Sequence, residues 1–205
     1  MIRLLQHYTS NFKPLIDISK PIHEAYCEKH GYSLHLKEVP QYEVYNGLEK
    51  LNQILEVCED GDIALVMDAD AMVTNLLFKV EQFLENDKDF YFSDGMNCGV
   101  FIFRATPFSK YRIKSVIYLI EKGQYNCEQD AFEDIFKDRS DRHVSILPHP
   151  CFNSYLSQYY PEVKQPVTKE QGQWEPGCFV LHFPALPLEQ RINLMKEYSQ
   201  YIVYE

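Results

Sequence analysis

The sequence predicts an α/β fold in which a central, mostly parallel mixed sheet is flanked by helices. Short apolar runs alternate with segments of helical period in the first half of the chain, a pattern typical of parallel strands joined by helices. The order becomes mixed in the second half, so some strands there are expected to be antiparallel or inserted. The 205 residues show neither an internal repeat nor a linker, and we therefore expect a single domain.

The first half of the chain is expected to hold three strands and two helical regions. Pro14 and Pro21 are expected to interrupt the first helical region, and Gly31 is expected to end it. The second region has leucines at helical spacing and is amphipathic. The expected elements are a strand over 2–6, one or two helices over 11–30, a strand over 32–39, a helix over 47–58 and a buried strand over 63–67.

The second half is expected to hold shorter strands between helices. A polar turn over 94–97 separates two apolar strands, and the stretch over 150–177 shows no period. The expected elements are helices over 77–86, 107–121 and 128–137, strands over 90–93, 99–103, 144–147 and 179–181, and a closing helix from Leu188 to about Ile202.

Charge and hydropathy exclude some functions. A nucleic-acid partner is not expected, because the net charge is −10 and a nucleic-acid binder carries a basic face. An acidic protein still binds an anionic nucleotide when a metal ion carries the positive charge. We see no signal peptide and no run near the ~20 apolar residues that a membrane span needs, so we expect a cytoplasmic protein without a membrane span.

Cysteine spacing favours an intracellular protein. The six cysteines form no C-x-x-C pair and no zinc-finger spacing, and several stand in apolar surroundings. We interpret them as reduced, mostly buried thiols, with disulfides as the alternative.

The most informative motif is Asp68-Ala69-Asp70, which directly follows the apolar run over 63–67. Ligands bind beyond the carboxyl ends of such strands in open α/β sheets. Two carboxylates there are costly unless something compensates them, and a hard divalent cation with a substrate diphosphate would do so. A strand that ends in a solvated acidic turn is the alternative, since D-x-D is a short and common pattern.

Three further segments are candidates for function. The turn from Asp94 through Asn97 to Gly99 offers side chains that bond hydroxyl groups, although it also fits a plain hairpin. The acidic triplet Glu128-Gln129-Asp130 fits a site or a charge that complements the helix dipole. His182, at the end of the last strand, is a candidate ligand for an ion such as Mn²⁺ or simply a packed histidine.

Taken together, these motifs resemble GT-A-type glycosyltransferases. The pattern is a strand followed by D-A-D, then N-x-G before a strand, then E-Q-D at a helix start, then a strand followed by H-F-P. It is most similar to the retaining galactosyl-, xylosyl- and mannosyltransferases, over residues from Leu4 to about Arg191. It also resembles glycosyltransferase domains of large algal DNA viruses that decorate a capsid glycoprotein, which would imply the host cytoplasm.

The resemblance implies a single GT-A-like, Rossmann-type domain over 1–205. A nucleotide-binding half would cover about 1–75, and a half for the donor sugar and the acceptor would cover about 76–205. It also implies Mn²⁺ or Mg²⁺ as cofactor, a nucleotide-sugar donor such as a UDP-hexose or UDP-deoxyhexose, and a glycan or glycoprotein acceptor. The reaction would be transfer of the sugar to a hydroxyl group, with retention.

The resemblance also implies a role for each candidate residue. Asp68 and Asp70 would hold the metal and the donor, and His182 would be the third metal ligand. The remaining donor contacts would come from His7, Tyr8, Thr9, Lys50, Asn97 and Gly99. Gln129 and Asp130 would lie near the reacting carbon, and Asp94 would hold the donor sugar; these three are our predicted catalytic residues.

The chain departs from the family at one place, and three rival functions stay open. Related enzymes often follow the histidine with a Gly and a Lys that binds the diphosphate, but here 183–187 reads Phe-Pro-Ala-Leu-Pro. Neutralisation of the diphosphate would then depend more on the metal, or on Arg191 or Lys50. A haloacid-dehalogenase-type phosphatase also uses D-x-D, although Met72 stands where that motif has Thr or Val. A non-catalytic module that binds nucleotide sugars or glycans is the second rival, and a nucleotidyltransferase is the third.

Overall fold

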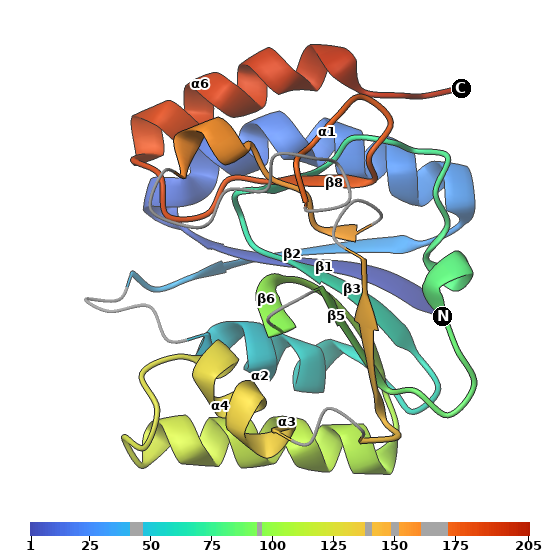
Figure 1. Ribbon diagram of the computed structural model, residues 1–205, viewed down its shortest axis with the longest axis vertical. Coiled ribbons are helices and arrows are strands. Elements are labelled where there is room, and N and C mark those ends of the chain that lie inside the picture. Colours follow the sequence, from blue (N-terminus) through green and yellow to red (C-terminus); the bar gives the residue numbers. More distant parts are fainter. Residues whose placement is uncertain (42–46, 94–95, 138–140, 149–151, 161–171) are drawn as a thin grey trace.

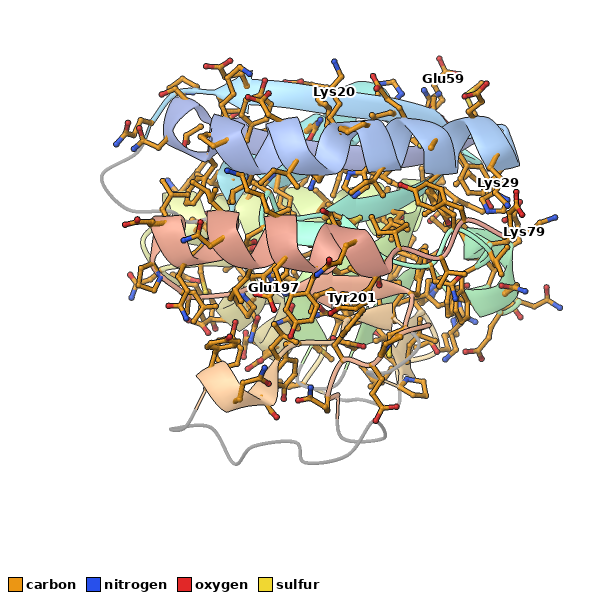
Figure 2. All side chains as sticks on the ribbon, turned by 90° about the horizontal axis from the view of Figure 1, so that it is seen from above. Lys20, Lys29, Glu59, Lys79, Glu197 and Tyr201 are labelled. Carbon is orange, nitrogen blue, oxygen red and sulfur yellow. The ribbon has the colours of Figure 1, made fainter. Side chains whose placement is uncertain are left out.

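A six-stranded sheet lies between two layers of helices (Figure 1). The computed structural model describes residues 1–41, 47–93, 96–137, 141–148, 152–160 and 172–205. One face of the sheet is covered by α1 (Lys13–His30) and α6 (Leu188–Tyr198), and the other by α2 (Leu48–Val57), α3 (Pro107–Glu121) and α4 (Glu128–Ile135). Figure 2 shows α1 and α6 side by side across their face, with charged residues such as Lys20 and Glu197 exposed.

The strands of this sheet confirm the predicted mixed, mostly parallel arrangement. β6 runs antiparallel to both of its neighbours, while the other pairings are parallel. The strand order is β2-β1-β3-β6-β5-β7. Their bounds are β1 Ile2–Thr9, β2 Ser33–Val39, β3 Ile63–Met67, β5 Phe90–Ser93, β6 Asn97–Arg104 and β7 Val144–Leu147.

Each face of the sheet has its own hydrophobic core, because successive residues of a strand point to opposite faces. On β1, Leu4 packs in the core beneath α1 and α6, whereas Leu5 packs in the core beneath α2, α3 and α4. On β6, Ile102 and Phe103 divide in the same way. With both faces covered, the ends of the strands are where a ligand can approach the sheet.

A second, two-stranded sheet was not predicted. β4 (Ala71–Val73) follows β3 closely and pairs antiparallel with β8 (Val180–His182), with Ala71 opposite His182. The last buried strand expected over 179–181 therefore exists, but it lies outside the main sheet. This small sheet joins two segments that are more than 100 residues apart in the sequence.

The helix predictions hold with two corrections. α1 is one helix that passes through Pro21 without ending, because Pro21 and Asp17 are exposed and water can bond the carbonyl group that the proline leaves unpaired. The helix expected over 77–86 is only a short 3₁₀ turn, Val80–Phe83. The chain turns at Gly31, whose φ of 70° is left-handed, as expected for the end of α1.

The cysteines that the structure describes carry free thiols. Four of these side chains are buried and Cys127 is half-buried, while Cys151 lies outside the described residues. Within the described ranges, we find no helix that is both long and apolar enough to cross a membrane.

Candidate active site

A pocket of about 490 Å³ opens where the parallel strands end and the antiparallel β6 begins. These strand ends meet at one edge of the sheet, which is where α/β proteins bind ligands. The lining residues come from several elements that end or begin near this edge: His7, Tyr8, Thr9, Asn11, Phe12, Val39, Gln41, Asp68, Ala69, Asp70, Asn97, Cys98, Gly99, Cys127, Glu128, Gln129, His182, Pro184, Ala185 and Arg191.

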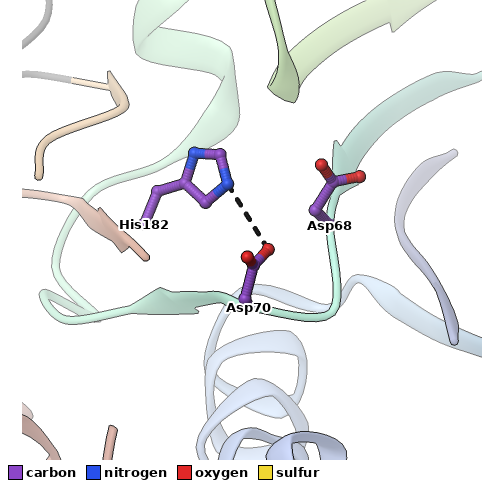
Figure 3. A group of neighbouring side chains, drawn as sticks. All are labelled: Asp68, Asp70 and His182. Atoms are coloured by element: carbon purple, nitrogen blue, oxygen red, sulfur yellow. Dashed lines mark ion pairs between the residues drawn. The ribbon is translucent and has the colours of Figure 1, made fainter. Parts of the chain in front are cut away.

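Asp68, Asp70 and His182 meet at the wall of this pocket (Figure 3). Each offers one ligand atom, and these atoms lie within 4.8 Å of one another. The backbone brings them together: the turn after β3 carries both aspartates, and the Phe183 amide donates to the Asp70 carbonyl at 3.0 Å. Pairing of β4 with β8 thus fixes His182 beside Asp70, with Nε2 3.4 Å from Oδ1.

Lys50 is fully buried behind Asp68. Its Nζ lies 2.6 Å from Asp68 Oδ1, and it donates to Glu128 Oε1 at 2.7 Å and to the Cys98 carbonyl at 2.7 Å. An ammonium group has three donors, and these three acceptors match them. Lys50 therefore holds Asp68 and the start of α4 in one buried charge cluster.

Arg191 approaches the second aspartate from α6. Its Nη1 donates to Asp70 Oδ2 at 2.8 Å, and its guanidinium carbon lies 5.4 Å from the centre of the Phe12 ring. Burial raises the pKa of Asp70, but His182 and Arg191 outweigh that effect and the pKa lies below its ordinary value of 3.8. Asp70 is therefore an ionised carboxylate at neutral pH.

Gly99 makes room for the His182 ring. A Cβ at this position would lie 2.1 Å from His182 Cε1, and the backbone of Gly99 is not left-handed, so the ring is what excludes a larger residue. Gly47 has a similar role beside Glu128, because a Cβ there would lie 2.2 Å from Glu128 Oε2. Both glycines thus accommodate side chains of the site.

His7 provides a neutral imidazole at the end of β1. Burial, followed by the nearby charge of Lys50, lowers its pKa from 6.5 to about 3. Tyr8 and Thr9 follow it and are half-buried at the pocket wall. This end of the pocket therefore offers polar groups without charge.

Most predicted site residues do line the pocket. They are His7, Tyr8, Thr9, Asp68, Asp70, Asn97, Gly99, Gln129 and His182. Lys50 does not line it but lies behind Asp68, and Asp130 is exposed outside it. Asp94 lies outside the described residues. The roles assigned to all of the predicted site residues stay predictions.

Some pocket residues were not expected. Asn11, Phe12 and Gln41 lie near strand ends, a position that could have suggested them. Asn153, which contacts His182, lies in the stretch without a period, and no sequence signal indicated it.

Comparison with solved structures identifies the fold. A glycosyltransferase involved in the glycosylation of the major capsid of PBCV-1 has a TM-score of 0.70 and 16% identity, over 96% of this chain and 98% of that one. The galactosyltransferase LgtC, solved with donor and acceptor sugar analogs, has a TM-score of 0.62 and 14% identity, over 98% and 96%. Mouse xyloside xylosyltransferase 1 has a TM-score of 0.54 and 10% identity, over 90% and 98%.

These proteins are GT-A glycosyltransferases, and this chain shares their fold. No protein-family model matches the chain, and no curated protein sequence matches it. The shared fold does not favour a haloacid-dehalogenase-type phosphatase.

Proposed function

We propose that this chain, which has the GT-A fold, is a metal-dependent glycosyltransferase. It would move a sugar from a nucleotide diphosphate, such as a UDP-hexose or UDP-deoxyhexose, to a hydroxyl group of a glycan or glycoprotein. The observation that carries this proposal is the convergence of Asp68, Asp70 and His182 in the pocket at the ligand-binding edge of the sheet.

The donor set fits a divalent metal. Two carboxylates and one imidazole nitrogen suit Mn²⁺, and the carboxylates also suit Mg²⁺. When bound, such an ion would neutralise the diphosphate and act as a Lewis acid on the leaving group. Asp68 and Asp70 are in ion pairs with Lys50 and Arg191, and these contacts orient both carboxylates at the pocket wall.

Arg191 is the candidate for the missing diphosphate-binding lysine. It lines the pocket, and a guanidinium group presents five donors, of which Nη1 and Nε bond Asp70 and the Leu186 carbonyl. The remaining donors suit phosphate oxygens. Lys50 is less suited to this part, because the cluster around it accounts for three donors and it does not line the pocket.

The carboxylates of the pocket favour retention. An inverting enzyme needs a carboxylate base beside the acceptor hydroxyl. Among the described pocket residues the carboxylates are Asp68, Asp70 and Glu128, and each is in an ion pair with Lys50 or Arg191. Gln129, an uncharged residue, lies in the same wall and is the proposed neighbour of the reacting carbon.

The proposed nucleotide and acceptor are supported by separate observations. Neutral His7, with Tyr8 and Thr9, suits an uncharged base and a ribose. A glycoprotein acceptor is supported by the PBCV-1 enzyme, which is involved in the glycosylation of a capsid protein.

Calorimetric titration tests the proposal. UDP, GDP and a panel of nucleotide sugars would be titrated with Mn²⁺ and with EDTA into the wild type, Asp70→Asn and the exposed control Asp60→Asn. We expect metal-dependent binding of one nucleotide family, lost in Asp70→Asn and kept in the control. The rate of sugar transfer should then fall about 10²–10³-fold in Asp70→Asn, because the activation barrier rises by a few kcal/mol.

Different outcomes would identify the rival functions. If no nucleotide binds in the presence of metal, the proposed donor site is wrong. Hydrolysis of a simple aryl phosphate would indicate a phosphatase, release of pyrophosphate a nucleotidyltransferase, and tight donor binding without turnover a binding module. An inverted anomer in the NMR spectrum of the product would overturn retention.

A further inference from the structure

Behind His182, on the side away from Asp70, lies a chain of hydrogen-bonded amides. The Gly99 amide nitrogen lies 2.9 Å from Asn97 Oδ1, which lies 2.9 Å from Asn153 Nδ2. The same Nδ2 lies 3.2 Å from Ser93 Oγ, and Asn153 Oδ1 lies 3.2 Å from His182 Nδ1. Asn153 is only 2% exposed, so bulk water does not compete for its bonds to Ser93 and His182, whereas Asn97 is half-buried at the pocket wall.

The backbone decides the direction of every bond in this chain. A backbone N–H can only donate, so the Asn97 atom that faces Gly99 must be the carbonyl oxygen. That oxygen can only accept, so Asn153 must turn its NH₂ group toward it. The carbonyl oxygen of Asn153 is then left facing His182.

An oxygen that only accepts requires a proton on the ring nitrogen that faces it. His182 therefore carries its proton on Nδ1 when the ring is neutral, and Nε2 holds the lone pair toward Asp70. Turning the Asn153 amide over would break its bond to Asn97, because two carbonyl oxygens would then face each other, although the Ser93 hydroxyl could still donate to Asn153. Nε2 lies 3.4 Å from a carboxylate oxygen, so either a second proton on the ring, which makes it cationic, or a metal ion in the place of that proton makes this contact favourable.

We infer that Asn153 is a positioning residue that fixes the tautomer of His182 so that Nε2 is presented as a metal ligand. The inference rests on the proposed metal site and deepens it. It does not require Asn153 to touch the substrate or the ion. Hydrogen-bond partners of ligand histidines act in this way in metalloproteins, and their loss lowers metal affinity by about 10–100-fold.

The first test is the tautomer in the metal-free wild type. Two-bond ¹H–¹⁵N correlation NMR of the histidine rings, with the His182 signals assigned by their loss in His182→Gln, reports which nitrogen carries the proton at a pH where the ring is neutral. We expect protonated Nδ1. Protonated Nε2 in the wild type would overturn the inference, and this measurement needs no variant that could fail to fold.

The second test separates positioning from structural support. Asn153→Leu removes the acceptor, and we expect the proton to move to Nε2 and the affinity for Mn²⁺ alone to fall by about 10–100-fold. Asn153→Asp keeps an oxygen toward Nδ1 and should keep the wild-type tautomer, although it loses the donor to Asn97. Asn75→Ala removes another buried amide, which bonds the Gly177 carbonyl away from the pocket, and should leave tautomer and affinity unchanged.

The outcomes also distinguish this inference from the proposed function. If Asn153→Leu keeps the Mn²⁺ affinity of the wild type, or keeps the wild-type tautomer of His182, the positioning role is wrong. The glycosyltransferase proposal is not affected by that result. Absence of Mn²⁺ binding by the wild type would overturn the proposed metal dependence, and the tautomer would still decide the role of Asn153.

Discussion

Replacement of Gly99 by alanine tests how tightly the fold constrains His182. The new Cβ would lie 2.1 Å from Cε1, 2.8 Å from Nε2 and 2.9 Å from Nδ1 of the ring. Ordinary contacts begin near 3.4 Å, so the ring must move by about 1.3 Å or the backbone must yield. A shift of that size breaks the 3.2 Å bond to Asn153 or displaces Nε2 from Asp70.

We expect Gly99→Ala to lower the free energy of unfolding by about 1–3 kcal/mol, the usual cost of overpacking a filled site. We also expect it to weaken Mn²⁺ binding by about 10–100-fold, because a ligand histidine would be misplaced. Urea unfolding followed by circular dichroism gives the first quantity, and calorimetric titration of Mn²⁺ gives the second.

The control is a double-mutant cycle with His182→Ala. If the ring is the cause, Gly99→Ala should cost almost nothing once the ring is removed, which gives a coupling energy of about 1–3 kcal/mol. An equal cost with and without the ring would refute the argument, as would full Mn²⁺ affinity in Gly99→Ala.

The buried groups give three further predictions. Lys50→Met should destabilise the fold by about 3–5 kcal/mol in urea unfolding, because it removes the cation shared by buried Glu128 and half-buried Asp68. Lys37→Met at an exposed ion pair should cost at most about 1 kcal/mol, and similar costs for the two variants would contradict this. Gly47→Ala should displace Glu128 and strain a backbone with φ of 76°, which lowers the melting temperature, and an unchanged melting temperature would disprove the contact. Burial lowers the pKa of His23 from 6.5 to about 3, so its contribution to stability is complete above pH 6.5 and declines as pH falls toward 3. His23→Gln should therefore reduce the pH dependence of the free energy of unfolding in that range by up to about 1.4 kcal/mol per pH unit. An unchanged slope would count against this.

Sequence reasoning was strongest where a pattern is local. The apolar run before Asp68 is a buried strand, and the polar residues after it do lie at the ligand-binding edge. The helical spacing of apolar residues over 107–121 predicted the bounds of α3 correctly. These features depend on residues within one element, so composition and spacing determine them.

Sequence reasoning failed where distant segments decide the structure. The three residues of β4 are too few to show a period, and their partner is β8, more than 100 residues away. The burial of Lys50 was equally hidden, because a lysine on a helix is usually exposed and its partners Asp68, Cys98 and Glu128 lie on other elements. Asn153 gave no signal, since its role depends on an amide orientation set by Gly99.

The small sheet of β4 and β8 makes the site depend on how the end of the chain docks. His182 and Arg191 belong to this last part of the chain, whereas Asp68 directly follows β3 of the main sheet. The ladder that joins them has only three residue pairs, so local opening there would separate the two halves of the site and leave the main sheet intact. A ligand that contacts both halves would therefore stabilise the pairing of β4 with β8, and its binding should appear as slower hydrogen exchange of the β4 and β8 amides.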